Sequence, residues 1–203
     1  MLKLSKILFT EETVETVSQA SSLALAKLDP YLGSYGDEIG FVLYKKEQHK
    51  FPDIIAAVTI TIKPLCGIYH KIERAAADHG YGPFIYEVAL SEYPIIPDFE
   101  ISTQAQAVWM KFFNREDIEA VSVQDMEDKN GCDFYKGIYF KHVESNFKYL
   151  DDYVPHGVQL KNPIDVSELY RRHHMNVVNG IVSEKKLTGL VETFFHHRIR
   201  STS

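Results

Sequence analysis

The chain has 203 residues, of which 45% are hydrophobic and 25% charged, and its formal net charge is −6. These values are typical of a globular protein and exclude a disordered chain, a collagen-like repeat and a coiled-coil rod. The acidic balance argues against sequence-independent nucleic-acid binding, which needs clustered cations. No stretch approaches the roughly 20 apolar residues of a membrane span. We therefore expect a cytoplasmic protein whose partners include neither nucleic acid nor membrane.

The first forty residues predict a strand, a helix and a loop. Residues 2–9 alternate moderately between apolar and polar, as a strand does. Thr10 is a favourable N-cap, and apolar residues then recur at helical spacing as far as Leu28. Pro30 ends this helix. Residues 31–40 contain three glycines and predict a loop.

Three closely spaced apolar segments predict an antiparallel meander. Residues 40–46 form a short apolar segment, and residues 54–63 are rich in β-branched side chains, which favour strands. Residues 67–75 complete the set. In this third strand, alternation places three side chains on one face: Ile68, His70 and Ile72.

A glycine turn follows the third strand. Gly80 and Gly82 flank one residue, so backbone amides there could approach an anion without obstruction from a Cβ atom. Pro83 suits the first turn of a helix because its missing N–H is not needed there. Such a helix would direct its free N–H groups at the same place, and a pyrophosphate would fit. A tight turn between a strand and a helix explains the same residues.

The rest of the chain predicts alternating short elements. Residues 95–96 predict a short strand, and Ser102 predicts the N-cap of a further helix. That helix carries one apolar stripe, which should pack on the sheet: Ala105, Val108, Trp109 and Phe112. Residues 134–147 are aromatic and predict a strand, residues 165–178 predict a helix, and Ser183 caps a last helix.

The cysteines and histidines do not predict a metal site. Cys66 and Cys132 are too few for a disulfide framework and favour a reducing compartment. Neither lies in a CxxC pair. The pairs at 173–174 and 196–197 place neighbouring histidines on different helix faces, whereas a helical zinc pair needs i, i+4 spacing. We expect no metal, and we expect Cys66 to be a small core residue.

The order of predicted elements resembles the GNAT superfamily of N-acetyltransferases. Residues 77–82 match its Gln/Arg-x-x-Gly-x-Gly/Ala motif, with Ala77 in the place of Gln or Arg. Residues 80–89 look like the Gly-Tyr-Gly-Pro-Leu-Leu-Tyr-Asp-x-Ala signature of GNAT-like proteins of tailed bacteriophages, and a helix with a Val-Trp pair follows. The resemblance covers residues 1–115 and implies a single domain over 1–203. Residues 116–203 would be an extension with two helices.

The resemblance implies an α/β fold with a mixed, mainly antiparallel sheet flanked by helices. It implies direct transfer of an acetyl or other acyl group from its coenzyme A thioester to an amine on a small molecule or a protein, without a metal. Pantetheine would pair with the backbone of the strand before the glycine turn, and the pyrophosphate would lie on the turn. The implied coenzyme A contacts are Ile72, Arg74, His79, Gly80, Tyr81, Gly82 and Pro83.

Such a transfer needs a base for the acceptor amine, and the resemblance places it on or beside the strand leading to the turn. The candidates there are Tyr69, His70 and Glu73. Structural roles explain the same residues, since His70 suits a strand face and Glu73 could pair with Arg74. Trp109 takes the place of the family's tyrosine acid and could line an acceptor pocket, although a core position also explains it.

A non-catalytic function is the alternative. Ala77 and Trp109 replace two family side chains, which favours a bacteriophage module that keeps the fold for binding. It could be virion-associated, or it could inhibit a host factor in the host cytoplasm through the acidic surface that the net charge of −6 implies.

Overall fold

The computed structural model describes residues 23–33, 36–45, 52–98, 101–126, 132–133, 135–136, 154–175, 177–179 and 184–200. These residues form an eight-stranded sheet in the order β6-β7-β5-β4-β3-β2-β1-β8. The strands are β1 (Leu23–Gly33), β2 (Gly36–Lys45), β3 (Asp53–Thr61), β4 (His70–Ala77), β5 (Ile95–Ile96), β6 (Ile118–Ser122), β7 (His156–Leu160) and β8 (Val177–Asn179). The helices are α2 (Gly82–Glu92), α3 (Thr103–Phe113), α5 (Val166–Arg172) and α6 (Glu184–Arg200), with a 3-10 turn, η2 (Val123–Asp125).

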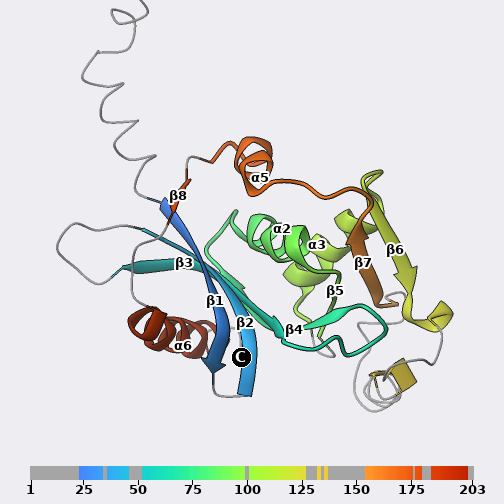
Figure 1. Ribbon diagram of the computed structural model, residues 1–203, viewed down its shortest axis with the longest axis horizontal. Coiled ribbons are helices and arrows are strands. Elements are labelled where there is room, and N and C mark those ends of the chain that lie inside the picture. Colours follow the sequence, from blue (N-terminus) through green and yellow to red (C-terminus); the bar gives the residue numbers. More distant parts are fainter. Residues whose placement is uncertain are drawn as a thin grey trace, which may run out of the picture.

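The sheet is mixed and mainly antiparallel. From β1 to β4, each strand pairs antiparallel with the next strand in sequence. Beyond β4, β7 pairs antiparallel with β5 on one side and with β6 on the other. Two junctions are parallel, β4 with β5 and β1 with β8. Helices α2 and α3 lie within the curve of the sheet, and α6 lies on the other side of β1 to β3 (Figure 1). The predicted fold class is therefore confirmed.

Two hydrophobic cores lie on opposite faces of β1 to β4 because side chains alternate along each strand. On β2, Phe41 and Leu43 pack toward α2, whereas Val42 and Tyr44 pack toward α6. All four side chains are buried, with at most 1% of their surface exposed. Among the described residues, no helix combines the length and the apolar character that crossing a membrane requires.

The predicted helix to Leu28 and the predicted loop at 31–40 are wrong over the described residues. The chain there forms the β1–β2 hairpin, which closes at Gly33 and Gly36. Along β1, Leu25 joins the core on the α2 side, whereas Ala24 and Leu28 join the core on the α6 side. The helical spacing of apolar residues was therefore coincidental. The predicted strand at 2–9 and the helix start at Thr10 lie outside the described residues.

Other predictions agree more closely with the structure. The strands expected at 40–46, 54–63, 67–75 and 95–96 correspond to β2, β3, β4 and β5. Ser102 caps α3 by accepting a hydrogen bond from the Ala105 amide. The helix expected at 165–178 ends early, because α5 stops at Arg172 and residues 177–179 form β8. Ser183 and most of 134–147 lie outside the described residues. The part of the chain beyond residue 115 adds the strands β6 to β8 and the helices α5 and α6.

The two cysteines, which favoured a reducing compartment, are paired in the structure. Cys66 and Cys132 form a disulfide across a sequence separation of 66. Cys66 is buried, as expected, in a small cluster with Ile96 and Tyr135. The Tyr135 hydroxyl donates a 2.9 Å hydrogen bond to the carbonyl of Pro97, just after β5. Spacing alone gave no sign of this pairing, because the fold brings the two segments together.

Candidate functional site

A bulge in β4 changes which side chains face which helix. Ile60 pairs with Ile72, but the preceding residue Thr59 pairs with Arg74, so Glu73 is an extra residue on β4. Ile72 consequently joins the core under α2, whereas Arg74 contacts α6 through Glu192. Simple alternation could not predict this exchange. Ile68, expected on the same strand face as Ile72, precedes β4 and is 52% exposed.

The C-terminal half of β4 extends past its neighbour. β4 and β5 pair only at His70–Ile95 and Lys71–Ile96, and β4 then continues to Ala77 while β5 ends. Residues 73–77 are half-buried, although β3 beside them is almost entirely buried. A strand in the middle of a sheet normally has neighbours along both edges. This half-exposed edge leads directly to the glycine turn.

The glycine turn joins β4 to α2 as predicted. Gly80 has a φ of +89°, which favours glycine, and Pro83 lies in the first turn of α2. Apart from its neighbours in the chain and the backbone of its own helix, a Cβ atom added at Gly80 or at Gly82 would have no atom of the described residues within 4 Å. Tyr81 is the N-cap, its side chain makes no capping hydrogen bond, and the first turn of α2 has no acidic residue. The turn therefore offers space and helix N–H groups to an anion.

An ion-pair cluster lies where β4 and β5 part. The Lys71 ammonium is 2.8 Å from a Glu73 carboxylate oxygen and 3.0 Å from an Asp98 oxygen. We call these three residues the Lys71 cluster. Burial lowers the pKa of Lys71, but the hydrogen bonds and charges of Glu73 and Asp98 outweigh it and raise the pKa overall. Lys71 thus stays charged. Sequence reasoning missed Lys71 and Asp98, because only the β4–β5 pairing brings Asp98 to β4.

The three candidate bases have different surroundings. Tyr69 is buried, and burial, with a smaller effect from the charge of Glu119, raises its pKa. His70 is also buried, and its Nδ1 lies 2.7 Å from the carbonyl oxygen of Thr61. A carbonyl only accepts, so Nδ1 carries the hydrogen. The Glu73 side chain is 23% exposed. It is therefore the candidate whose ionisable group lies nearest to solvent.

Arg74 lies on the α6 side of the sheet, away from Ile72. Its guanidinium is 3.3 Å from a Glu38 carboxylate and 2.9 Å from Glu192 on α6, and it stacks near the ring of Phe195. Its side chain is only 8% exposed and that of Glu38 only 3%. Burial lowers the pKa of Arg74, and the two carboxylates raise it by more. Arg74 therefore anchors α6, whereas Glu73 pairs with Lys71.

Trp109 is buried, as the apolar stripe of α3 predicts. It has no exposed surface, and its ring centroid lies 5.7 Å from that of Tyr86 and 5.9 Å from that of Phe112. Within the described part of the chain, the indole Nε1–H has no hydrogen-bond partner. The core explanation of Trp109 is therefore the one that the structure supports.

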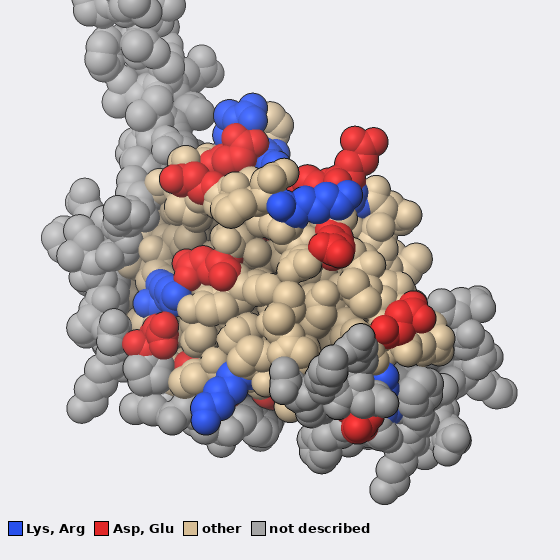
Figure 2. Space-filling model, turned by 45° about the vertical axis from the view of Figure 1, so that its right-hand side comes forward, with Lys and Arg blue, Asp and Glu red and all other residues tan. Residues whose placement is uncertain are grey.

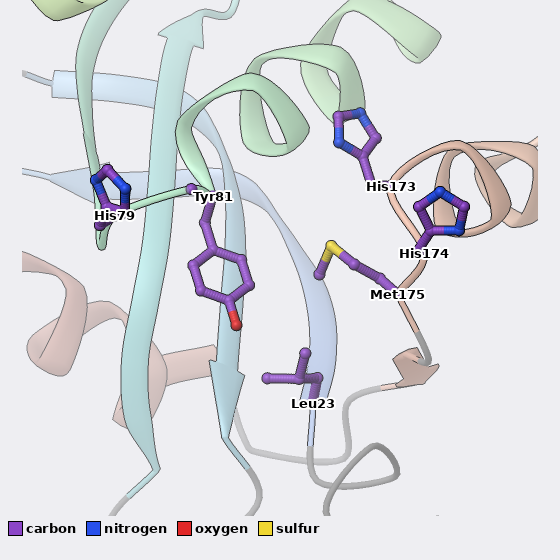
Figure 3. Close-up of a pocket in the computed structure, with 7 residues that line it drawn as sticks. Leu23, His79, Tyr81, His173, His174 and Met175 are labelled. Carbon is purple, nitrogen blue, oxygen red and sulfur yellow. The ribbon is translucent and has the colours of Figure 1, made fainter.

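A hollow of about 360 Å³ adjoins the glycine turn, and we call it the turn hollow. Tyr81 and Met175 face the same space in Figure 3, with Leu23 from the start of β1 nearby. His173 and His174 lie beside it at the end of α5. The described residues that line it are Leu23, His79, Gly80, Tyr81, His173, His174 and Met175. The sequence placed the turn residues together but gave no sign that the end of α5 would meet them.

Charged side chains are scattered over the visible described surface. In Figure 2, acidic and basic side chains are interspersed and separated by wide uncharged areas. The net charge of −6 therefore does not gather into one acidic patch on this described face.

The mixed, mainly antiparallel sheet and its helices are consistent with a GNAT-like α/β fold. A scan against models of protein families finds no match to the chain. A search of curated proteins likewise finds no significant match. The function must therefore be argued from the site.

Proposed function

We propose that this protein is an N-acyltransferase that moves an acetyl or other acyl group from coenzyme A to an amine. The observation that carries the proposal is the half-exposed edge of β4, which extends past β5 and leads straight into the glycine turn. An extended ligand could add to this edge as a peptide adds to a sheet. Its anionic end would then reach the start of α2.

The residues along this path fit coenzyme A. The backbone of 73–77 offers donors and acceptors to pantetheine, and the open space at Gly80 and Gly82 accommodates a pyrophosphate without a Cβ in the way. The cosubstrate would supply the acyl group in activated form, as a thioester. The chain itself supplies binding, orientation and donors in fixed positions.

Glu73 is the base that we favour among the three candidates. It lies at the bulge, where β4 and β5 part, and its carboxylate is partly exposed. Lys71 holds this carboxylate in place, so it acts as a positioning residue. Tyr69 is a poorer base at neutral pH, because its raised pKa keeps it protonated. His70 is less exposed than Glu73, and because its Nδ1–H donates to the Thr61 carbonyl, only Nε2 could take up a proton.

A binding protein without transfer activity is the second candidate, and Trp109 favours it. The resemblance implies a tyrosine acid at this position, whereas the indole of Trp109 is fully buried and does not titrate. Such a protein would bind coenzyme A or a related ligand and release it unchanged. Transfer assays on a protein that binds the cosubstrate decide between the two candidates.

The first experiment measures binding of acetyl-CoA by calorimetry and by thermal unfolding. A ligand at 100 times its Kd that binds only the folded state should add about 2.7 kcal/mol of stability. Gly82→Leu should abolish binding and leave the fold intact, because a Cβ there meets no more distant residue of the described structure. Gly189→Leu on α6 is the matched control, since a Cβ there likewise has no more distant described residue within 4 Å. Equal acetyl-CoA affinity in both variants would show that the glycine turn is not part of the binding site.

The second experiment separates the base from the binding site. Glu73→Gln keeps the shape of the side chain but cannot take up a proton, so transfer to an amine should fall by about 10² to 10⁴-fold. Binding of acetyl-CoA should stay unchanged. Full transfer activity in Glu73→Gln would exclude Glu73 as the base.

A further inference from the structure

We infer that the Cys66–Cys132 disulfide is a redox-sensitive latch that fixes β4 against β5 where the two strands part. Reduction of this bond would loosen the Lys71 cluster, which spans the junction between the strands. The effect on acyl transfer rests on the proposed function. The effect on the positions of Pro97 and Asp98 does not depend on it.

The two cysteines belong to a small hydrophobic cluster that is separate from the two main cores. We call it the third cluster, and its buried members are Cys66, Tyr69, Ile96, Val123, Met126, Cys132 and Tyr135. On β5, Ile96 joins this cluster, whereas its neighbour Ile95 joins the core under α2. The third cluster therefore packs on the face of β5 that is turned away from α2.

One half of the disulfide is tied to the start of β4. The Tyr69 amide donates a hydrogen bond to the Cys66 carbonyl, and the Leu65 amide donates one to the Tyr69 carbonyl, both at 2.9 Å. Tyr69 directly precedes β4. A Cβ atom added at Gly157 on β7 would lie 2.8 Å from the Tyr69 ring, so this ring packs closely against β7. The position of Cys66 is therefore coupled to the position at which β4 begins.

The other half of the disulfide is tied to the end of β5. Tyr135 lies three residues after Cys132, and both side chains are buried. The Tyr135 hydroxyl donates its 2.9 Å hydrogen bond to the carbonyl of Pro97, the first residue after β5. Asp98 follows and lies 3.0 Å from the Lys71 ammonium. The Cys132 half thus holds Asp98 in place through the Tyr135–Pro97 hydrogen bond.

The disulfide joins these two halves across the junction that the Lys71 cluster spans. Backbone pairing between β4 and β5 is confined to two residue pairs, so it restrains the junction weakly. If Asp98 moves away, the Lys71 ammonium attracts the Glu73 carboxylate without competition from a second carboxylate. A carboxylate held in this way takes up a proton less readily. We therefore expect transfer to slow when the latch opens.

Opening the latch is a two-electron reduction by a dithiol. The dithiol gives two electrons and two protons, the S–S bond breaks, two cysteine thiols form, and the dithiol closes to its own disulfide. Cys66 and Cys132 are at most 1% exposed, so the third cluster must open locally before a thiolate can attack. Met126 Sδ, 3.2 Å from Cys66 Sγ, can accept the new S–H. The two main cores contain neither cysteine, so the reduced protein should stay folded.

The first test compares hydrogen exchange in the oxidised protein and in the protein reduced with dithiothreitol, with peptide mapping to confirm each state. After reduction, the amides of residues 95–98 should exchange about fivefold faster, as expected for one lost hydrogen bond. The amides of β2 and β3 should exchange as before. Free thiols in the air-oxidised wild type, reduction only on global unfolding, or unchanged exchange at 95–98 would each overturn the latch.

Tyr135→Phe distinguishes a latch from a purely structural disulfide. It removes the hydroxyl that holds Pro97 and keeps the ring and both cysteines. It should speed exchange at 95–98 by a similar factor, and reduction should then add little, because both changes act through the same hydrogen bond. Tyr170→Phe on α5 also removes one hydroxyl and should leave this exchange unchanged. Additive effects of Tyr135→Phe and reduction would contradict the proposed path.

Transfer assays separate this inference from the proposed function. Reduction and Tyr135→Phe should each lower kcat about tenfold, as expected when a hydrogen bond to a charged group is lost. The KM for acetyl-CoA should stay unchanged, because no residue of the glycine turn belongs to the third cluster. If the oxidised wild type transfers no acyl group, the proposed function is wrong, and hydrogen exchange still decides the latch. Equal transfer in both redox states would show that the disulfide does not control activity, and the proposed function would stand.

Discussion

Replacing Trp109 with alanine tests whether α3 owes its position to core packing or to a ligand site. Trp109 has no exposed surface and contacts the rings of Tyr86 and Phe112. A buried tryptophan removes about 150–250 Å² from water. At about 25 cal/mol per Å² this contributes roughly 4–6 kcal/mol.

The indole N–H of Trp109 reduces the loss of stability that we expect from its removal. The indole Nε1–H has no partner among the described residues, and an unsatisfied buried donor costs about 1–3 kcal/mol. Alanine removes that cost together with the ring. We therefore expect Trp109→Ala to lower the free energy of unfolding by about 3–4 kcal/mol, within the usual range for such truncations.

Urea unfolding followed by circular dichroism measures the change, with Trp109→Phe and Met110→Ala as companions. Phenylalanine fills most of the space and brings no N–H, so it should stay within about 1.5 kcal/mol of the wild type. Met110 is 45% exposed on the same helix, and its truncation should change stability by less than about 0.5 kcal/mol. Near-native stability of Trp109→Ala together with lost acyl transfer would refute the packing argument and place Trp109 in the active site.

Three further predictions concern charge and covalent ties. Arg74→Met should lower the free energy of unfolding by about 3–5 kcal/mol, because it leaves Glu38 buried without its cation. Adding Glu38→Met should recover most of this loss, as a double-mutant cycle in urea would measure. A large loss of stability in the double variant would contradict this prediction. Cys132→Ser should cost up to about 4 kcal/mol, because the Cys66–Cys132 bond closes a long loop, and non-reducing peptide mapping should find that bond in the wild type. Hydrogen bonds from Arg115, with help from Arg172, hold the pKa of Asp117 below its ordinary value. Its folded-state pKa is depressed, so its contribution is present above about pH 4 and is lost on acidification. Asp117→Asn should lower the urea midpoint at pH 7, and a penalty that persists undiminished below pH 4 would contradict the assignment.

The local features of the sequence predicted the centre of the fold. Residues 54–63 formed a strand because β-branched side chains favour one, and Gly80 and Pro83 fixed a turn and a helix start through backbone geometry. Ser102 capped α3 as its side chain suggests. These are effects between residues a few positions apart, so the sequence alone determines them.

The helix expected up to Leu28 failed for the opposite reason. Leu25 and Leu28 have helical spacing, but in β1 they lie on opposite faces of the sheet, and pairing with β2 decided in favour of the strand. The bulge at Glu73 likewise depends on the register with β3, and it moves Arg74 to the α6 side.

The candidate site likewise has a part that the sequence predicts and parts that only the tertiary structure brings together. Its turn, from Gly80 to Pro83, was readable because it is contiguous in the chain. The Lys71 cluster, the disulfide and the turn hollow join segments that are far apart in the sequence. Only the tertiary structure places these segments together, because contacts of this kind depend on strand order and helix packing, which no local pattern of side chains encodes.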